Sequence, residues 1–254
     1  MTTGYAVQVA LLITLVSGNA FAGVHDDGAV TQCNSAPDAT RVQYIIGYGS
    51  LMEDASRERT APHAGPARPV VVTGFARGWY SRSKGPGLGT TYLGVVEDVA
   101  SSLNAVMYEV EAGELAATDR RERSYCRVPV NPSAVKLLSA VESPIAKAQI
   151  WIYEIRAGDA APVDEEHPIV QSYVDIFLAG CLEQEERYKL QEFSLECVRT
   201  THGWSAYWVN DRVYPRRPFV FQPRAPQIDK LLSEEVPAHW SKLQLEGGDP
   251  RRDR

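Results

Sequence analysis

The sequence has few cysteines, and none of them has the spacing of a metal or redox site. Its 254 residues include only four, at Cys33, Cys126, Cys181 and Cys197. No two of these form a Cys-x-x-Cys pair, which argues against a zinc ribbon or a thioredoxin-type site. The histidines also lack the i,i+4 spacing of metal ligands, and we interpret each as a surface or hydrogen-bonded residue: His25, His63, His167, His202 and His239. The sequence therefore predicts no metal site.

Long runs of positive charge are absent as well. The formal net charge is −6, and no block of lysine and arginine is long enough to follow a nucleic-acid backbone. We therefore expect no nucleic-acid partner. Apolar residues are plentiful, because 44% of the chain is hydrophobic, which is enough to bury a core and argues against general disorder.

Residues 1–22 form an apolar segment that stands apart from the rest of the chain. They carry no charged side chain and end in Ala20-Phe21-Ala22, which places small residues at the −3 and −1 positions of a cleavage site before Gly23. We expect a signal peptide and an exported protein, periplasmic or secreted, with no stable membrane insertion once the peptide is removed. An uncleaved membrane anchor is the alternative, because no lysine or arginine precedes the apolar core.

Export would allow the cysteines to form one or two disulfides, because the compartment outside the cytoplasm is oxidising. Cys181 and Cys197 lie on successive predicted helical segments that are joined by a short connection. Their Cα atoms can therefore approach disulfide range, and we predict that this pair is bonded.

The sequence is organised around a buried strand that ends in a glycine turn. Residues 44–52 have the sequence Tyr-Ile-Ile-Gly-Tyr-Gly-Ser-Leu-Met. Glycine tolerates positive φ and has no Cβ, so the backbone can turn sharply there, and successive N–H groups can form a concave nest that binds an anion. Met52 stands where a dinucleotide-binding fingerprint needs its third glycine. Tyr48 and Met52 also occupy the glycine positions of a nucleophile elbow, which makes Ser50 a poor nucleophile. The alternative interpretation is an ordinary tight turn.

Short strands precede a helical part of the chain. Alternation and β-branched residues predict a first strand with its glycine loop over 42–52 and further strands over 69–80, 90–96, 103–110, 125–130 and 146–155, with one helix inserted over 111–121. This order favours an α+β fold with a small mixed β-barrel of about six strands over a doubly wound sheet. From about residue 168 we expect a helix to residue 188 with Pro168 in its first turn, a shorter helix over 193–198, and then an extended proline-containing segment.

The expected domain organisation has four parts. A signal peptide (1–22) is followed by a flexible lead-in (23–41), one domain (42–240) with a helical C-terminal extension, and a disordered tail (241–254). The sequence shows no internal repeat, and no linker divides the domain.

A charged stretch at the end of the inserted helix is the second candidate site. Residues 119–125 have the sequence Asp-Arg-Arg-Glu-Arg-Ser-Tyr. The negative end of the helix dipole and burial would both raise the pKa of Glu122, whereas Arg121 and Arg123 would lower this pKa if they faced inward. A carboxylate poised between its two states suits general acid–base catalysis. The alternative interpretation is a solvated charge run whose members compensate one another.

Together, Gly-Tyr-Gly-Ser-Leu at 47–51 and Asp-Arg-Arg-Glu-x-x-Tyr at 119–125 resemble the γ-glutamylcyclotransferase-like family, over about Tyr44 to Ile155. The helical segment that follows, through residues 208–212, looks like bacterial and plant relatives. The resemblance implies a small mixed β-barrel with packed helices. It also implies a substrate loop and a catalytic residue: the loop comprises Gly47, Tyr48, Gly49, Ser50 and Leu51, and Glu122 is the acid–base residue.

The resemblance further implies that the backbone N–H groups of Gly49, Ser50 and Leu51 receive the α-carboxylate of a γ-glutamyl group. Tyr125 would orient the substrate or Glu122. By position alone, Arg77 and Tyr48 are candidates for lining the pocket.

The implied reaction closes the γ-glutamyl group into 5-oxoproline and releases an amine or amino acid, without a metal or other cofactor. The aromatic residue that usually follows the loop in glutathione-specific members is replaced here by Met52 and Glu53, which argues against glutathione as the substrate. Two alternatives remain open at this point. One is an amidase or acyltransferase acting on γ-glutamyl-like amides, and the other is a barrel that binds an anionic ligand without turnover.

Overall fold

The apolar stretch that begins at Gln43 forms the centre of a mixed β-sheet. In the computed structural model, which describes residues 33–83, 88–139, 145–156, 158–217 and 222–246, all five residues of strand β1 (Gln43–Gly47) are buried. β1 pairs antiparallel with β3 (Thr91–Val110) on one side and parallel with β6 (Gln149–Ile155) on the other. A strand buried on both faces needs apolar side chains along its length, which explains the run of Tyr, Ile and Ile. The expected signal peptide and its cleavage site lie outside the described residues.

The described part of the chain contains one ten-stranded sheet and six α-helices, so the predicted α+β class is confirmed. The pairings run in the order β10-β9-β7-β3-β1-β6-β4, and β2 branches from β3 to pair with β5 and β8. The prediction of about six strands omitted five short strands of two or three residues each. The remaining strands are β2 (Arg68–Arg82), β4 (Tyr125–Val130), β5 (Val135–Leu137), β7 (Ile169–Val170), β8 (Thr201–His202), β9 (Trp208–Asn210) and β10 (Gln244–Leu245).

The two strands predicted over 90–96 and 103–110 are one continuous strand, β3, of 20 residues. The prediction separated them at Asp98–Ser101. These residues remain extended, but they bulge out of register, because the β2–β3 pairing passes from Thr73↔Ser102 to Phe75↔Glu97. Val99 is 97% exposed in this bulge. Exposed turn-forming residues in a bulge have the same composition as a loop, which explains the error.

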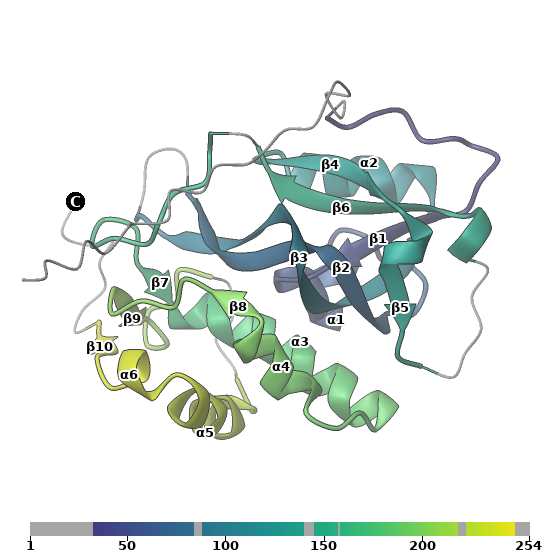
Figure 1. Ribbon diagram of the computed structural model, residues 1–254. Helices are drawn as coiled ribbons and strands as arrows, with labels where there is room; N and C mark the ends of the chain where they lie inside the picture. Colours follow the sequence, from purple (N-terminus) through teal and green to yellow (C-terminus); the bar gives the residue numbers. More distant parts are fainter. Residues whose placement is uncertain (1–32, 84–87, 140–144, 157, 218–221, 247–254) are drawn as a thin grey trace, which may run out of the picture. The chain divides into compact units, whose positions relative to one another are not determined.

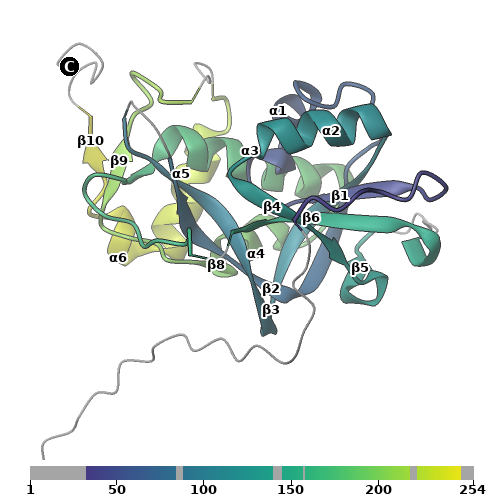
Figure 2. The same cartoon turned by 90° about the horizontal axis from the view of Figure 1, so that it is seen from above.

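The helices lie on two sides of this sheet (Figure 1). α3 and α4 pack against each other and against β2 and β3, and α5 and α6 follow beyond α4. α1 and α2 lie side by side in Figure 2. The Arg121 guanidinium at the end of α2 donates to the carbonyl of Ser56 in α1. The helices are α1 (Asp54–Glu58), α2 (Ala112–Arg121), α3 (Gln171–Tyr188), α4 (Phe193–Arg199), α5 (Ala225–Glu235) and α6 (Pro237–Trp240).

The helix predicted from Pro168 begins three residues later than expected. Ile169 and Val170 form the short strand β7, which pairs with Thr91 and with β9, so Pro168 does not lie in a helical first turn. α3 then begins at Gln171, and its first turn is capped from a distance. The carboxylate of Asp211 accepts hydrogen bonds from the backbone N–H and the hydroxyl of Ser172, at 2.7 and 2.6 Å.

The C-terminal segment is helical where an extended segment was predicted. Pro226 stands in the first turn of α5, a position where proline is compatible with a helix. Arg212 joins α5 to α3, because its guanidinium forms ion pairs of 2.7 Å with both Asp229 and Asp175. The expected tail from residue 241 includes β10, which pairs with β9, and residues 247–254 lie outside the described part.

Both cysteine pairs form disulfides. The predicted bond between Cys181 and Cys197 is confirmed, and it joins α3 to α4. The second disulfide joins Cys33 to Cys126 at the start of β4. Asn34 is also held there, because its side chain accepts a hydrogen bond of 2.9 Å from the backbone N–H of Arg127. The end of the expected flexible lead-in is therefore attached to the sheet.

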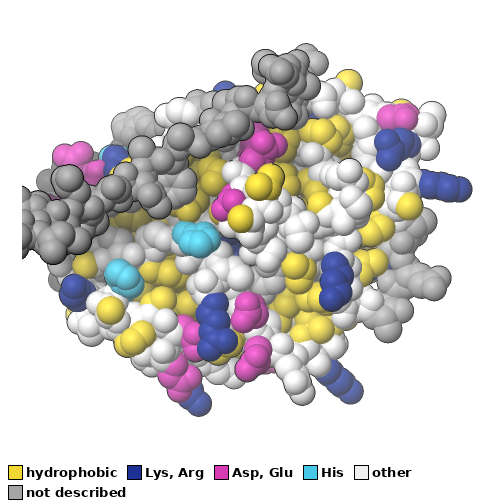
Figure 3. All heavy atoms as spheres, in the orientation of Figure 1, with side chains coloured by type: hydrophobic (Ala, Val, Ile, Leu, Met, Phe, Trp, Pro, Cys, Tyr) yellow, Lys and Arg dark blue, Asp and Glu magenta, His cyan; other side chains and the backbone are white. Residues whose placement is uncertain are grey.

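The surface carries mixed charge. Among the described residues on the face drawn in Figure 3, acidic and basic side chains are interspersed rather than gathered by sign. None of the described helices combines the length and hydropathy that crossing a membrane requires.

Candidate active site

A pocket opens where the glycine loop after β1 meets the end of α2. It encloses about 300 Å³ of empty space, part of which is open to solvent. The two sequence motifs contribute to its wall together, although 67 residues (52–118) lie between them. The lining residues are Ile46, Tyr48, Gly49, Ser50, Leu51, Leu93, Glu122, Tyr125, Tyr153 and Tyr173.

The two glycines of the loop are needed for close approach rather than for positive φ. Gly49 has φ −127°, and neither glycine is among the positive-φ residues of the described chain. A Cβ on Gly47 would lie 2.8 Å from the Cβ of Leu51, and a Cβ on Gly49 would lie 2.8 Å from the hydroxyl of Tyr173. Any larger residue would therefore push the loop away from its neighbours. Gly47 supports the loop from behind and does not line the pocket.

The loop has unused hydrogen-bond donors. The N–H of Met52 donates to the carbonyl of Gly49 in a 3₁₀ turn, and Gly49, Ser50 and Leu51 all line the pocket. The backbone N–H groups of Gly49 and Leu51 have no acceptor among the described residues. N–H groups at the start of such a turn can receive an anion.

Arg77 does not line the pocket, and its proposed role there was wrong. Its fully buried guanidinium lies behind the loop and donates at 3.2 Å to the carbonyl of Tyr48. Its other donors bond to Asn104 and to acceptors in and after α4: the Cys197 carbonyl and the hydroxyls of Thr200 and Thr201. Because all its N–H groups are used in this way, Arg77 fixes the loop and has no donor left for a ligand.

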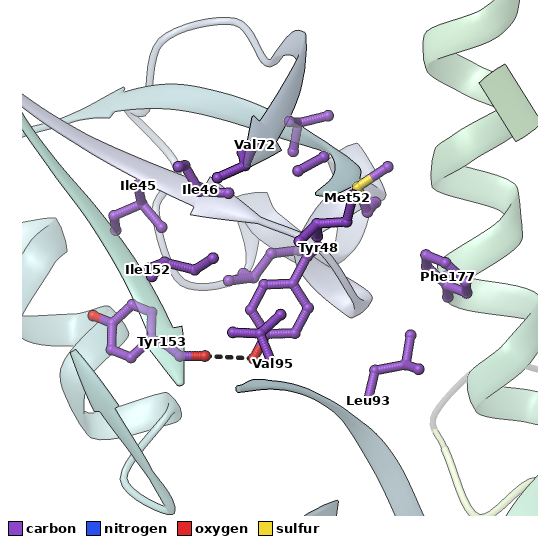
Figure 4. Packing of buried hydrophobic residues seen from close by; sticks show 14 of the residues in the cluster. Ile45, Ile46, Tyr48, Met52, Val72, Leu93, Val95, Ile152, Tyr153 and Phe177 are labelled. Atoms are coloured by element: carbon purple, nitrogen blue, oxygen red, sulfur yellow. Dashed lines mark hydrogen bonds between the residues drawn. The ribbon is translucent and has the colours of Figure 1, made fainter. Parts of the chain in front are cut away.

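The Tyr48 side chain forms part of the floor of the pocket. Figure 4 shows its ring pointing from the loop toward β6, where its hydroxyl donates to the carbonyl of Tyr153. The Tyr153 hydroxyl points away and donates at 2.7 Å to Asp119, which also forms an ion pair with Arg127. Asp119 therefore supports the pocket wall without facing the cavity.

The end of α2 places the cation Arg121 between the glycine loop and the carboxylate of Glu122. Arg121 donates to the Ser50 hydroxyl at 3.1 Å, to the Ser56 carbonyl and to the hydroxyls of Ser56 and Thr60. Its Nε lies 3.1 Å from the carboxylate of Glu122, whose side chain is 16% exposed. Arg121 therefore fixes the glycine loop and the carboxylate relative to each other.

Glu122 is held in conditions that favour proton uptake. Burial raises the pKa of its carboxyl above the ordinary 4.5, and the charges of Arg121 and Arg217 oppose this rise. Arg123, which was expected to lower this pKa if it faced inward, is exposed, and so is Arg120. The charged stretch is thus divided: Arg120 and Arg123 are solvated, whereas Glu122 lines the pocket and Arg121 forms an ion pair with it.

Tyr125 also lies in the pocket, at the first position of β4. Its hydroxyl donates at 2.9 Å to the carbonyl of Leu93, so the ring is held against β3. Burial raises the pKa of its phenol well above 10.0, which keeps the group protonated. No hydrogen bond joins Tyr125 to Glu122 in the described structure, so any orienting role of Tyr125 concerns the ligand.

Tyr173 is a pocket residue that the sequence analysis missed. It belongs to the apolar stripe of α3, which we interpreted as core packing, and nothing in that stripe distinguishes it. Burial raises the pKa of its phenol to about 12, and the nearby backbone N–H of Ser50 opposes this rise. The hydroxyl proton of Tyr173 has no acceptor among the described residues, so it is available to a ligand.

The described residues contain no cluster of three or more histidine, cysteine, aspartate or glutamate side chains arranged to hold a metal ion. The chemistry that the pocket offers is that of a carboxylate with a raised pKa, phenol hydroxyls and backbone N–H groups.

No family model and no curated protein match the sequence. Among solved structures, the chain is similar to one described as a γ-glutamyl cyclotransferase, with 13% identity and a TM-score of 0.47 over 62% of this chain and 86% of that chain. It is similar to an uncharacterised protein from Homo sapiens, with 14% identity and a TM-score of 0.44 over 59% and 87%. It is also similar to a γ-glutamyl cyclotransferase specific to glutathione from yeast, with 13% identity and a TM-score of 0.36 over 63% and 97%. These identities and TM-scores describe a remote likeness, so a function for this chain has to be argued from the residues of its own pocket.

Proposed function

We propose that this chain is a γ-glutamylcyclotransferase-type enzyme that converts a γ-glutamyl amine or peptide into 5-oxoproline and a free amine or amino acid. One observation carries the proposal: a carboxylate with a raised pKa, Glu122, shares a pocket with the unpaired N–H groups of Gly49 and Leu51. The N–H groups suit the α-carboxylate of the substrate, and Glu122 suits the proton transfer. The two sequence motifs supply both features.

The proposed reaction is an intramolecular displacement. Glu122 accepts a proton from the α-ammonium group, and the freed amine attacks the γ-carbonyl carbon to form the lactam C–N bond. The bond from that carbon to the leaving nitrogen then breaks as Glu122 returns the proton to this nitrogen. The attacking nitrogen gives up its second proton through Glu122 in the same way, and the released amine takes up this proton and leaves as an ammonium ion. Because the nucleophile is tethered to the carbon it attacks, orientation supplies much of the rate, and the reaction needs no metal or redox cofactor.

The remaining pocket residues have supporting roles in this proposal. Arg121 positions Glu122 against the loop through its contact with Ser50. The free phenol proton of Tyr173 is a donor for the oxygen that gains negative charge during the attack. Tyr125 and Tyr48 provide the walls that hold the γ-glutamyl chain in a folded conformation.

The proposal is tested by incubating the protein with γ-glutamyl amines, γ-glutamyl peptides and glutathione, and by measuring 5-oxoproline against the free amine. Equal amounts of both products are expected from at least one γ-glutamyl compound, with glutathione a poor substrate. Release of free glutamate or transfer of the acyl group would instead indicate an amidase or acyltransferase. Calorimetric binding without any product would indicate a binding protein.

The pH dependence of kcat/KM should reveal the pKa of the Glu122 carboxyl group. The free enzyme needs ionised Glu122, so kcat/KM is expected to fall as the pH decreases through the pKa of this group. Because burial raises this pKa, the acid limb of the profile should lie above 4.5. The measurement is initial rates of 5-oxoproline release at subsaturating substrate across the acid range. An acid limb at or below 4.5 would contradict the assigned role.

We also propose that the protein works outside the cytoplasm. Its two disulfides suit an oxidising compartment, and the apolar segment before Gly23 has the features of a signal peptide.

A further inference from the structure

A third arginine, Arg217, lies at the edge of the pocket on an aromatic surface. Its guanidinium carbon is 4.3 Å from the ring centre of Tyr92 and 5.7 Å from that of Tyr173. The two rings are themselves in contact, with centres 5.2 Å apart. Stacking of this kind fixes the plane of an arginine while leaving its N–H groups, which lie in that plane, free to donate.

The backbone that carries Arg217 is fixed to the start of α3. The N–H of Arg216 donates at 2.7 Å to Asp211, the residue that caps α3, and the N–H of Arg217 donates at 3.3 Å to the Ser172 hydroxyl. Ser172 is the residue before Tyr173. The position of Arg217 is therefore set by the same helix turn that places Tyr173 in the pocket.

Arg217 differs from the other two arginines near the pocket in the use of its donors. The guanidinium groups of Arg77 and Arg121 are bonded to the loop, to neighbouring hydroxyls and carbonyls and, for Arg121, to Glu122. The guanidinium of Arg217 has no hydrogen bond or ion pair to any residue in the described part of the chain, and it makes only the two ring contacts. A cation whose five donors are unused is available to an external anion.

The location of Arg217 indicates which part of a ligand it would meet. Tyr173 lines the pocket, whereas Tyr92 does not, and Arg217 lies nearer to Tyr92. It therefore sits outside the inner pocket formed by the glycine loop and Glu122. It is still close enough for its charge to oppose the rise that burial causes in the pKa values of Glu122 and Tyr125. A γ-glutamyl group held by the loop would extend its leaving group toward this rim.

From these observations we infer that Arg217 binds a carboxylate on the leaving group of the substrate, so that the enzyme prefers γ-glutamyl amino acids and peptides to γ-glutamyl amines. The inference rests on the proposed function and specifies its substrate class. The planar fork of a guanidinium matches the two oxygens of a carboxylate, and a partly desolvated position strengthens such a pair.

The test compares two substrates that differ only in this carboxylate, γ-glutamyl-alanine and γ-glutamyl-ethylamide. For the wild type, kcat/KM for 5-oxoproline release is expected to be about 10- to 100-fold higher with γ-glutamyl-alanine, the range given by one charged hydrogen-bonded contact. Arg217→Met should remove this preference by lowering kcat/KM for γ-glutamyl-alanine, and it should change the value for γ-glutamyl-ethylamide by less than about twofold. Arg217→Lys, which keeps the charge without the fork, should retain part of the preference.

Arg123→Met is the matched control, because Arg123 is exposed and its side chain has no hydrogen bond or ion pair in the described structure. It should leave both substrates unchanged, and thermal unfolding should show that all variants are folded. Equal wild-type values for the two substrates would overturn the inference and leave the proposed function standing. An equal loss on both substrates in Arg217→Met would also overturn it, because Arg217 would then act on the shared γ-glutamyl group. Release of 5-oxoproline from no γ-glutamyl compound would overturn the proposed function itself, and this inference with it.

Discussion

Replacing Glu122 with glutamine is expected to lower turnover by at least about 10²-fold, within the range of about 10²–10⁴ that general acid–base groups contribute. Glutamine has the size of glutamate and can still form hydrogen bonds, but it cannot take up the proton that the α-ammonium group must lose. The glycine loop should keep its position, because Arg121 retains its bonds to Ser50, Ser56 and Thr60. Binding of the γ-glutamyl group should therefore survive.

Two measurements separate these effects: 5-oxoproline release and ligand affinity by calorimetry, at equal concentrations of folded protein. Glu58→Gln is a matched control, because Glu58 is exposed and its side chain forms no hydrogen bond or ion pair in the described structure. This variant should cyclise at the wild-type rate. A Glu122→Gln protein that does the same would show that Glu122 is not the catalyst.

Replacing Gly180 with alanine should destabilise the protein and disturb the pocket at the same time. A Cβ on Gly180 would lie 2.4 Å from the backbone nitrogen of Glu53 and 2.5 Å from the carbonyl carbon of Met52. These are backbone atoms, so α3 and the 3₁₀ turn that follows Gly49 would have to move apart. Overpacking of this kind destabilises by about 1–3 kcal/mol, which outweighs the helix propensity that alanine adds.

Gly113→Ala, at another helical glycine, is expected to increase the stability of the protein. A Cβ at Gly113 meets nothing within 4 Å, so this variant should be more stable than the wild type by about 0.4–1 kcal/mol. Urea unfolding gives both free energies, and 5-oxoproline release should fall only in Gly180→Ala. A Gly180→Ala protein as stable and active as the wild type would mean that α3 and the loop do not pack as closely as described.

Sequence patterns predicted the elements whose signals are local. The helix over 111–121 begins with a capping box between Glu111 and Glu114, and the strand over 125–130 contains β-branched residues, Val128 and Val130. The meeting of the glycine loop with Glu122 was expected only through the resemblance of two motifs. In the structure, the loop and Glu122 are held together because Arg121 donates to the Ser50 hydroxyl and forms an ion pair with Glu122.

The parts that sequence could not predict depend on distant contacts. Tyr173 has the same helical spacing as its core neighbours, and only the approach of Gly49 makes it a pocket residue. Arg217 lies among prolines and charged residues that resemble an extended surface segment. Its place is set by Asp211 and Ser172, which are joined across a gap of 39 residues. A carboxylate that caps a helix from so far along the chain leaves no local signal.

The order of these residues along the chain has a consequence for biosynthesis. Ser50 and Glu122 are translated well before Tyr173, and Arg217 and the Asp211 cap come later still. A nascent chain therefore carries Glu122, the proposed acid–base residue, long before the wall that encloses it, and the α3 cap can form only after residue 211 has left the ribosome. An enzyme of the proposed kind can enclose its substrate only after residue 217 has been made, so the proposed exported precursor would be inactive until that point in its synthesis.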